Sequence, residues 1–379
     1  MAGRVTSDIK RPRRPKVQEH RSELDFNWLR FSHARVPIAR KRAVLRATPD
    51  IETALEQIGL LPVNAGGHTI TDALVALAPL RRDRLWLEDK ARMIVGLTSP
   101  AFPERLRQIV DPPVLFYIEG QAVNWGRPAV AVVGTRNPTP SGEEFAFLLA
   151  YGLAQQGIIV VSGLARGIDS AAHEGALAAG GQTVAVCATG LDSVYPRENR
   201  RLAARIKTGG SLLSEFQIGT TVRRHHFPQR NRLISGLTQG TVVVEAGSRS
   251  GSLITARMAA EQGRTVFAVP GSVSSPLSKG VNALLRDGAR LVETVADITD
   301  ELSLVPVISR AERPRQRPGL APASLMDAID DVPTPIDRLV RRTGLTVAEV
   351  SAILLSMELN GDVTRVAGGF VKSMPPSGP

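Results

Sequence analysis

The sequence predicts an α/β fold: a doubly wound, mainly parallel sheet, with a small helical module before it and a winged-helix-like module after it. The chain has 379 residues, which is too long for one ordinary domain. Between residues 129 and 271, short β-branched runs alternate with Ala- and Gly-rich helical stretches. This alternation is typical of buried parallel strands joined by crossover helices. The flanking segments show helical patterns without it, so each is assigned to a separate module.

The first 50 residues are strongly basic. They hold 13 Lys and Arg against 5 acids, so they carry +8 of the net charge of +11. Residues 1–21, which include RPRRPK, are predicted to be a disordered basic arm. The charge fits a polyanionic partner such as nucleic acid, and it fits a solubilising tail about equally well.

Residues 22–90 are predicted to form the small helical module. Leu24, Trp28 and Phe31 open a helical pattern. The segment PDIETALEQIGLLP supplies a second helix, which Pro62 and an Asn-Ala-Gly-Gly turn should end. The residues of this module do not indicate a function.

The α/β domain is predicted to span residues 91–300. Residues 92–128 are a connecting region with one short strand at 114–118. The following strands are 129–134, 158–163, 183–190, 211–215, 241–247 and 265–271, with a final short one at 289–292. Helices are expected between them, for example at 141–156 and 169–179, with right-handed crossovers.

The chain ends in a predicted linker and a compact module. Residues 301–323, which include RPRQRPG, form the linker. In residues 324–373 three helical stretches precede VTRVAGGFVK, a hairpin with Gly368 and Gly369 at its turn, and this is the order of a winged helix. The last helix, TVAEVSAILLSMELNG, contains no Lys or Arg, so it is not expected to read a major groove. We expect this module to bind protein or to pack.

Composition excludes several classes of protein. No run of about 18 apolar residues occurs, so no membrane span is predicted. The single cysteine, Cys187, lies in the apolar run TVAVCATG and is interpreted as a buried hydrophobic residue. Disulfides within the chain are thereby excluded, which fits a cytoplasmic protein. No Cys cluster or H-E-x-x-H motif offers a metal site, and no cofactor is expected.

Five predicted strands end in glycine-containing loops, and Gly at these ends lets backbone N–H groups approach an anion. Because the carboxyl ends of parallel strands meet at one edge, these loops should line one crevice. Arg136, Arg166, Arg230 and Arg249 stand among them, so a phosphate-bearing ligand is favoured over glycine turns that only connect strand to helix. The candidate site residues in these loops are Gly134, Thr135, Arg136, Ser162, Gly163, Arg166, Gly167, Ser250, Gly251 and Ser252.

The loop sequences argue against a dinucleotide or an ATPase site. Neither the G-x-G-x-x-G pattern after the first strand nor a G-x-x-x-x-G-K-[ST] run is present. Asp169 opens a helix and is interpreted as an N-cap. Glu245 is expected to pair with a crevice arginine, and acid catalysis is the less favoured role. For His173, core packing and phosphate contact are comparably plausible.

The stretch FPQRNRLISG is predicted to be a helix with Pro228 in its first turn. At 100° per residue, Arg230 points with the apolar face over the sheet edge and into the crevice. Arg232 points almost oppositely, toward solvent or a ligand that wraps outward, and Asn231 lies between them. Phe227 is either a hydrophobic staple or a platform for a base.

Taken together, GTR, SGLARGIDSAAHEGAL, GLDSVYPREN, HHFPQRNRLISGL, VVEAGSRSGSLITARMAAEQGR and VFAVPG resemble the DNA-processing protein A family, also called DprA or Smf. The resemblance covers about residues 100–295. It implies an extended Rossmann-like domain, a SAM-like module before it, and Arg136, Arg197 and the Phe227–Arg232 segment as DNA contacts. The glycine signals common in the family's N-terminal module are hard to find here.

The resemblance also implies a function. It indicates a cytoplasmic, homodimeric, non-enzymatic protein that binds single-stranded DNA. Such a protein protects incoming DNA and loads the RecA recombinase onto it during natural transformation (competence). The alternative from another class is a Rossmann-like nucleotide-processing enzyme, similar to a phosphoribohydrolase, with Glu245 as the acid. A transcription regulator is disfavoured because the last helix contains no Lys or Arg.

Overall fold

The computed structural model describes residues 16–48, 50–60, 75–304, 325–326, 328–329, 333–359, 362–366 and 368–372. The chain forms two compact units, residues 1–309 and 310–379. Within the described chain, no helix is both long and apolar enough to cross a membrane.

The larger unit begins with four helices, α1 (Lys16–His33), α2 (Ile38–Ala47), α3 (Ile51–Gln57) and α4 (Leu77–Trp86). The prediction of a disordered arm is wrong for residues 16–21, because α1 starts at Lys16, where helix-favouring Lys, Gln and Glu lead into buried apolar residues. The arm's residues 1–15 lie outside the described residues. Asp50 caps α3 by accepting from the Thr53 N–H at 2.8 Å. Pro62, predicted to end this helix, also lies outside the described residues.

The connecting region contributes more structure than the sequence predicts. It holds β1 (Arg92–Gly96), α5 (Glu104–Arg107) and β2 (Leu115–Gly120). The strand β1 was not predicted. It pairs antiparallel with β2, which in turn pairs antiparallel with β6 (Ser211–Ser214). Residues 92–128 therefore extend the sheet rather than merely connecting two modules.

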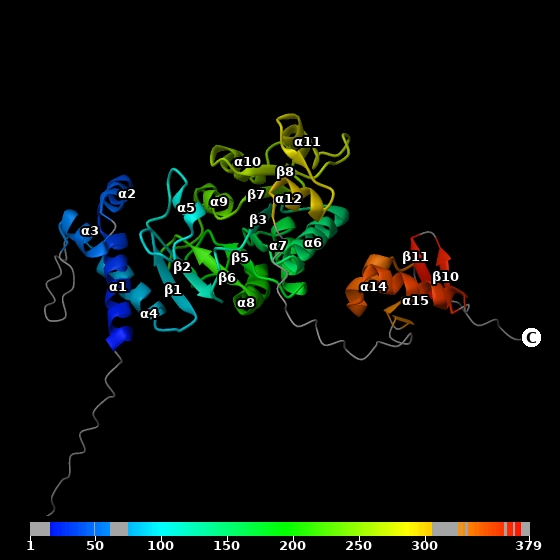
Figure 1. Ribbon diagram of the computed structural model, residues 1–379, viewed down its shortest axis with the longest axis horizontal. Helices are drawn as coiled ribbons and strands as arrows, with labels where there is room; N and C mark the ends of the chain where they lie inside the picture. The colour runs from blue at the N-terminus through cyan, green and yellow to red at the C-terminus, as the bar shows by residue number, and fades with distance from the viewer. Residues whose placement is uncertain are drawn as a thin grey trace, which may run out of the picture. The chain divides into compact units, whose positions relative to one another are not determined.

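One sheet of nine strands runs through this unit in the order β1-β2-β6-β5-β4-β3-β7-β8-β9 (Figure 1). Strands β3 to β9 are parallel, as predicted. Their bounds are β3 (Ala129–Val133), β4 (Ile159–Ser162), β5 (Thr183–Val186), β7 (Gly240–Val243), β8 (Thr265–Ala268) and β9 (Arg290–Leu291). The chain runs outward from β3 to β6 and then returns to place β7 on the other side of β3. Such a reversal of strand order opens a crevice at the carboxyl edge.

Helices cover both faces of the sheet (Figure 1). Val130 and Val132 of β3 pack with α6 (Pro140–Gln155) and α7 (Ile168–Ala178), whereas the alternate residues of β3 share a core with α9 (His226–Gly236) and α10 (Ser252–Glu261). This alternation follows from the period of two along a strand. The remaining helices are α8 (Arg200–Gly209), α11 (Lys279–Arg286) and α12 (Val295–Glu301), and the predicted linker's residues 302–304 follow α12 as a turn.

The four N-terminal helices share one core with the sheet. Trp28 of α1 lies against Gly96 of β1, where a Cβ atom would overlap the indole ring. The buried Asp83 carboxylate of α4 accepts from the Tyr117 hydroxyl and the Ile218 N–H, and lies 2.7 Å from His33 Nε2. Since a buried carboxylate needs such partners, these contacts fix the helical module onto the sheet.

The smaller unit contains α14 (Ile336–Thr343), α15 (Val347–Leu359), β10 (Val363–Val366) and β11 (Gly369–Lys372). The two strands form an antiparallel hairpin. Gly368 and Gly369 lie at its turn with φ angles of +95° and +146°, which favour glycine. The last two helices and the hairpin of the predicted helix–helix–helix–hairpin order are thus confirmed.

Candidate functional site

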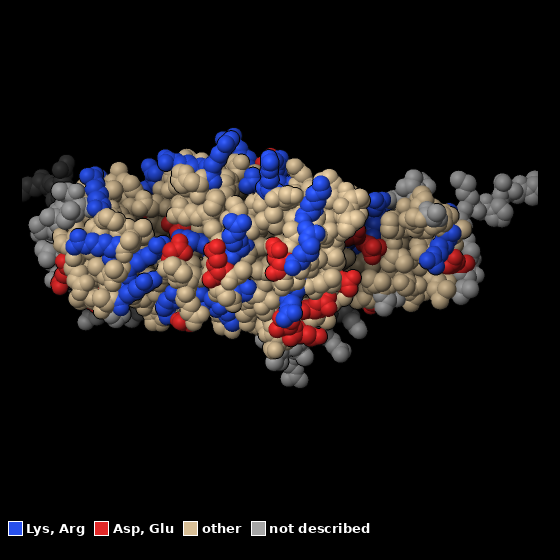
Figure 2. All heavy atoms as spheres, turned by 90° about the horizontal axis from the view of Figure 1, so that it is seen from above, with Lys and Arg blue, Asp and Glu red and all other residues tan. Residues whose placement is uncertain are grey.

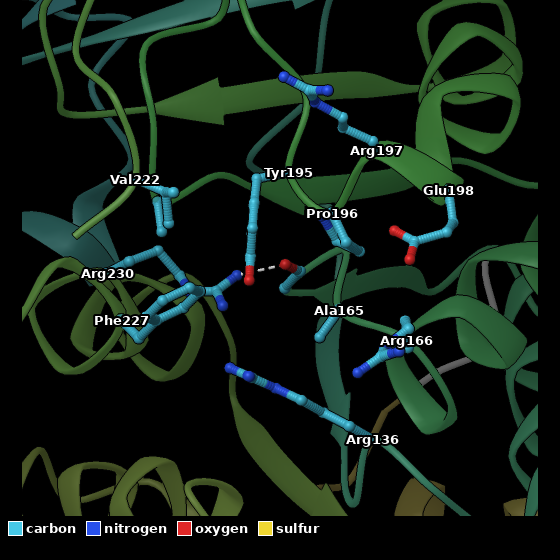
Figure 3. A pocket seen from close by; sticks show the side chains of 12 residues that line it. Arg136, Ala165, Arg166, Tyr195, Pro196, Arg197, Glu198, Val222, Phe227 and Arg230 are labelled. Atoms are coloured by element: carbon cyan, nitrogen blue, oxygen red, sulfur yellow. Dashed lines mark hydrogen bonds between the residues drawn. The ribbon is translucent and has the colours of Figure 1, made fainter. Parts of the chain in front are cut away.

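A pocket of about 450 Å³ opens at the carboxyl ends of β3, β4 and β5, beside the first turns of α9 (Figure 3). We call it the carboxyl-edge pocket. It brings together residues from two of the predicted loops, from the YPREN motif and from the FPQRNR segment. Its lining residues are Arg136, Gly163, Ala165, Arg166, Ala188, Tyr195, Pro196, Arg197, Glu198, Val222, Phe227 and Arg230.

Arg230 is the buried cation of this pocket. Its side chain is fixed by Nη1, which donates to the carbonyl oxygens of Gly163 and Val186, both at 2.5 Å. The residue is only 4% exposed, and burial lowers the pKa of its guanidinium. Its Nε has no hydrogen-bond partner among the described residues. The prediction that Arg230 reaches over the sheet edge into the crevice is confirmed.

The loop after β4 is shaped around Arg230. A Cβ atom on Gly163 would overlap Arg230 Nη1 and lie 2.7 Å from Asp169 Oδ2, so glycine is required here. Asp169 Oδ2 accepts from the N–H groups of Gly163 at 3.1 Å and Ala165 at 3.3 Å. Burial raises the pKa of the Asp169 carboxyl, and the nearby Arg230 charge opposes that rise.

The predicted N-cap role of Asp169 is wrong. The N-cap of α7 is Gly167, whose φ of +73° suits glycine, and Asp169 is the second residue of the helix. Its carboxylate instead turns back to the preceding loop. Asp169 therefore orders the strand-to-helix loop that forms one side of the pocket.

Two aromatic rings and one arginine form a wall of the pocket. The rings of Tyr195 and Phe227 have centroids 5.8 Å apart, and Arg136 Cζ lies 5.0 Å from the centroid of Phe227. The helix α9 starts at His226, so Phe227 lies inside it and not at the position before the cap that a hydrophobic staple requires. The wall offers flat groups on which a planar ligand can stack.

Sequence reasoning missed Tyr195, although it is 43% exposed at the pocket. One signal was available: it is one of only three tyrosines in the chain and stands next to Pro196 in the YPREN motif. The sequence reading took only Arg197 from that motif. In the structure Tyr195 points toward the centre of the pocket, whereas the Arg197 guanidinium lies at the rim (Figure 3).

Arg136, Arg166 and Arg197 are exposed at the pocket, so their charges face solvent. Glu198 is also exposed there and places one negative charge among them. Over the face of the molecule in Figure 2, Lys and Arg side chains are interspersed with Asp and Glu. That face therefore shows no purely basic patch, and the site is identified by the residues that line the pocket.

Several predicted site residues do not line the pocket, and their contacts support its backbone instead. The Ser162 hydroxyl donates to the Val132 carbonyl at 2.7 Å, and the Thr135 N–H donates to the Glu245 carbonyl at 2.8 Å. A Cβ on Gly134 would lie 2.6 Å from Ile168, so this glycine allows α7 to approach β3. The residues outside the lining are Gly134, Thr135, Ser162, Gly167, Asn231, Arg232, Ser250, Gly251 and Ser252.

The predicted solvent orientation of Arg232 is wrong. Its side chain is 7% exposed, with Nε 3.1 Å from Asp111 Oδ2 and Nη2 paired with Glu215 Oε2. It points away from Arg230, but Asp111 and Glu215, the residue after β6, contact it there. Burial raises the pKa of the Glu215 carboxyl, and the Arg232 charge opposes the rise. Arg232 is a buried structural cation.

Glu245 does not pair with an arginine as predicted. Its carboxylate accepts from the Thr139 N–H at 2.9 Å and from the Thr139 hydroxyl at 2.6 Å, next to the start of α6. It is absent from the lining of the carboxyl-edge pocket. A catalytic acid at this position would thus not face the pocket.

His173 packs in the core. Its Nδ1 lies 2.8 Å from the Thr183 hydroxyl, which itself donates to the Val160 carbonyl, so Nδ1 carries the hydrogen. Burial lowers its pKa to about 3, which keeps the ring neutral. Cys187 is buried as predicted, and burial raises its pKa to about 12. Neither residue offers a charge to a phosphate.

Comparison with known proteins gives consistent matches. Residues 93–303 match the family model described as DNA recombination-mediator protein A, and residues 309–369 match the DprA winged helix domain. Protein Smf of Escherichia coli is 39% identical over 295 residues, which cover 76% of this chain and 79% of that protein.

Two solved structures have a similar fold. DNA processing protein A from Streptococcus pneumoniae aligns with a TM-score of 0.56 at 33% identity, covering 76% of this chain and 96% of that one. The protein of the same name from Helicobacter pylori aligns with a TM-score of 0.51 at 30% identity, covering 56% of this chain and 95% of that one. The latter structure is described as giving insight into that protein's single-stranded DNA binding mode.

Proposed function

Because this chain belongs to the DNA-processing protein A (DprA/Smf) family, we propose that it binds single-stranded DNA in the carboxyl-edge pocket. We propose further that it protects incoming DNA and loads a RecA recombinase onto it during natural transformation, as a cytoplasmic homodimer. In this role the protein positions DNA and catalyses no reaction of its own.

One observation carries the proposal: four arginines and two aromatic rings line a single pocket. A single strand presents phosphates, which guanidinium groups bind, and unpaired bases, which stack on flat side chains. Arg136, Arg166 and Arg197 are exposed for phosphates, and Phe227 with Tyr195 provides the stacking surface. Since these groups do not read base edges, binding should tolerate many sequences.

The same geometry favours binding over nucleotide hydrolysis. The acid considered for a phosphoribohydrolase-like enzyme was Glu245. Its carboxylate is held by Thr139 at the start of α6 and lies outside the pocket lining. The site residues therefore support a ligand-holding role.

The test is a fluorescence anisotropy titration with a labelled single strand of about 20 nucleotides and the matching duplex, each at about 50 and 200 mM salt. We expect tighter binding of the single strand. Its affinity should fall with salt by a logarithmic slope of about 0.7 for each phosphate contact. Arg136→Ala should weaken binding at least tenfold, whereas Arg257→Ala, which removes an exposed arginine of α10 outside the pocket lining, should not. Equal affinity for the duplex, or normal binding by a folded Arg136→Ala protein, would contradict the proposal.

A further inference from the structure

The carboxyl-edge pocket is too small to hold more than a short piece of a DNA strand. A volume of about 450 Å³ lies within the range of pockets that enclose one drug-sized ligand. On the proposed function, a longer strand must therefore leave the pocket across a neighbouring surface. The loop between β6 and α9 is one such exit, because Val222 in this loop lines the pocket.

This loop is fixed on its pocket side by backbone hydrogen bonds. The Gly190 N–H donates to the Thr220 carbonyl at 3.0 Å. The Gly219 N–H donates to Asp192 Oδ1 at 2.8 Å. The loop is thus tied to the segment after β5 that also carries Tyr195 and Arg197.

On its other side the loop contacts the helical module. Arg82 of α4 donates from Nη1 to the Ile218 carbonyl at 3.3 Å, and the Ile218 N–H donates to the adjacent Asp83 at 3.1 Å. The Arg82 guanidinium lies against Gly219, where a Cβ atom would overlap it. The φ of Gly219 is +88°, so glycine is favoured here for its conformation as well as for space.

The surface on both sides of this contact is basic. Arg81 and Arg82 are exposed on α4, and Arg223 and Arg224 are exposed just after Val222. Among the described residues, no carboxylate forms an ion pair with any of the four. Asp192 is the nearby acid, and one of its oxygens already accepts the Gly219 N–H. Val222 is three positions after Gly219, so the two lie within about 11 Å of each other.

We propose that a single strand leaving the pocket runs past Arg223 and Arg224 and onto Arg81 and Arg82. The helical module is then part of the DNA-binding surface. Guanidinium groups with no carboxylate partner bind phosphates strongly, and they need no particular base. We call these four arginines the exit track. The inference rests on the proposed function and extends it to a second module.

The test compares a thymidine dinucleotide with an oligodeoxythymidylate of about 20 nucleotides, since only the longer one can extend beyond a pocket of this volume. The variant is Arg81→Gln/Arg82→Gln. We expect its affinity for the long strand to fall on the order of fivefold and its logarithmic salt slope to decrease by about 1.4, equivalent to two phosphate contacts. Its affinity for the short strand should not change. Arg223→Gln/Arg224→Gln should behave in the same way.

Two controls separate charge from loop structure. Arg35→Gln/Arg40→Gln removes two exposed arginines of the same module that lie outside α4, and it should bind both strands normally. Arg82→Lys keeps the charge and should retain most of the long-strand affinity. An unchanged long-strand affinity in Arg81→Gln/Arg82→Gln, or an equal loss for both strands, would overturn the exit track. Failure of the unmodified protein to bind either strand would instead refute the proposed function itself.

Discussion

The two sides of helix α9 hold two arginines in opposite electrostatic settings. Arg230 faces the carboxyl-edge pocket, where its Nη1 donates to two backbone carbonyls. Arg232, two residues later and about 200° around the helix, is paired with both Glu215 and Asp111. Both residues are less than 10% exposed.

The difference shows which charge is available to a ligand. Two carboxylates form ion pairs with Arg232, so its charge is neutralised within the protein. Carbonyl oxygens orient Arg230, and no carboxylate forms an ion pair with it among the described residues. The charge of the buried Asp169 carboxyl acts on Arg230, but its Oδ2 is held by two backbone N–H groups. A buried guanidinium with no carboxylate at ion-pair distance is expected at a site where a ligand supplies a further anion.

The largest effect should follow from breaking the Arg232 side. Arg232→Met leaves Glu215, whose side chain is 9% exposed, as a buried carboxylate without its cation. Loss of one partner of a buried pair costs about 3–5 kcal/mol of unfolding free energy. Urea denaturation followed by circular dichroism measures this cost. The fraction that remains folded should bind DNA normally, since Arg232 does not line the pocket.

Glu215→Gln serves as the control for this variant. Burial raises the pKa of Glu215, so the folded state favours the neutral carboxyl, and an uncharged amide should cost less than the loss of Arg232. The raised pKa also predicts a pH dependence of stability. The folded protein binds the Glu215 proton more tightly than the unfolded chain does, so the free energy of unfolding falls as the pH rises from about 4.3 toward the raised pKa. Glu215→Gln should remove that part of the pH dependence. Equal destabilisation by both variants would contradict this account.

Substitution of Arg230 is expected to lower DNA affinity rather than stability, and by a smaller free energy. Arg230→Met removes the cation of the pocket, and a charge-assisted contact to phosphate contributes about 1.5–3 kcal/mol. Affinity for a single strand should therefore fall about 10- to 100-fold in an anisotropy titration. The unfolding free energy should change less than in Arg232→Met, because Asp169, the buried carboxyl near Arg230, keeps its hydrogen bonds from the Gly163 and Ala165 N–H groups. Normal DNA affinity in the folded Arg230→Met protein would contradict the claim that the charge of Arg230 is available to a ligand.

The comparison also shows what the sequence predicted and what it did not. Hydrophobic runs in the sequence predicted the strands β3 to β9, and the helical period of 100° per residue predicted the direction of Arg230. Both patterns depend only on residues that are close together in the chain. The burial of Arg232 depends on Asp111, which is 121 positions away in the chain and belongs to a region predicted only to connect two modules. No local pattern contains such a contact.

The same limit explains the other errors. Glu245 was predicted to pair with an arginine, but its carboxylate accepts hydrogen bonds from Thr139. Asp169 was predicted to cap its own helix, but its carboxylate accepts from N–H groups of the preceding loop. Tyr195 was missed because only the folded chain brings YPREN beside the start of α9. Glycine-ended strands predicted the edge of the sheet correctly, whereas the choice among residues on that edge required the tertiary structure.

The smallest expected effect concerns the aromatic wall beside Arg230. Phe227→Leu keeps an apolar side chain but removes the flat ring that lies between Tyr195 and Arg136. Stacking of a base on an aromatic side chain contributes about 1–3 kcal/mol, and leucine should retain part of it. We therefore expect a loss of about 1 kcal/mol, or roughly fivefold in affinity, with little change in salt slope, because no phosphate contact is lost. Phe227→Tyr keeps the ring and should bind within about twofold of the unmodified protein. If leucine and tyrosine bind equally well, Phe227 only supports the pocket, and the affinity of this side of α9 resides in its arginines.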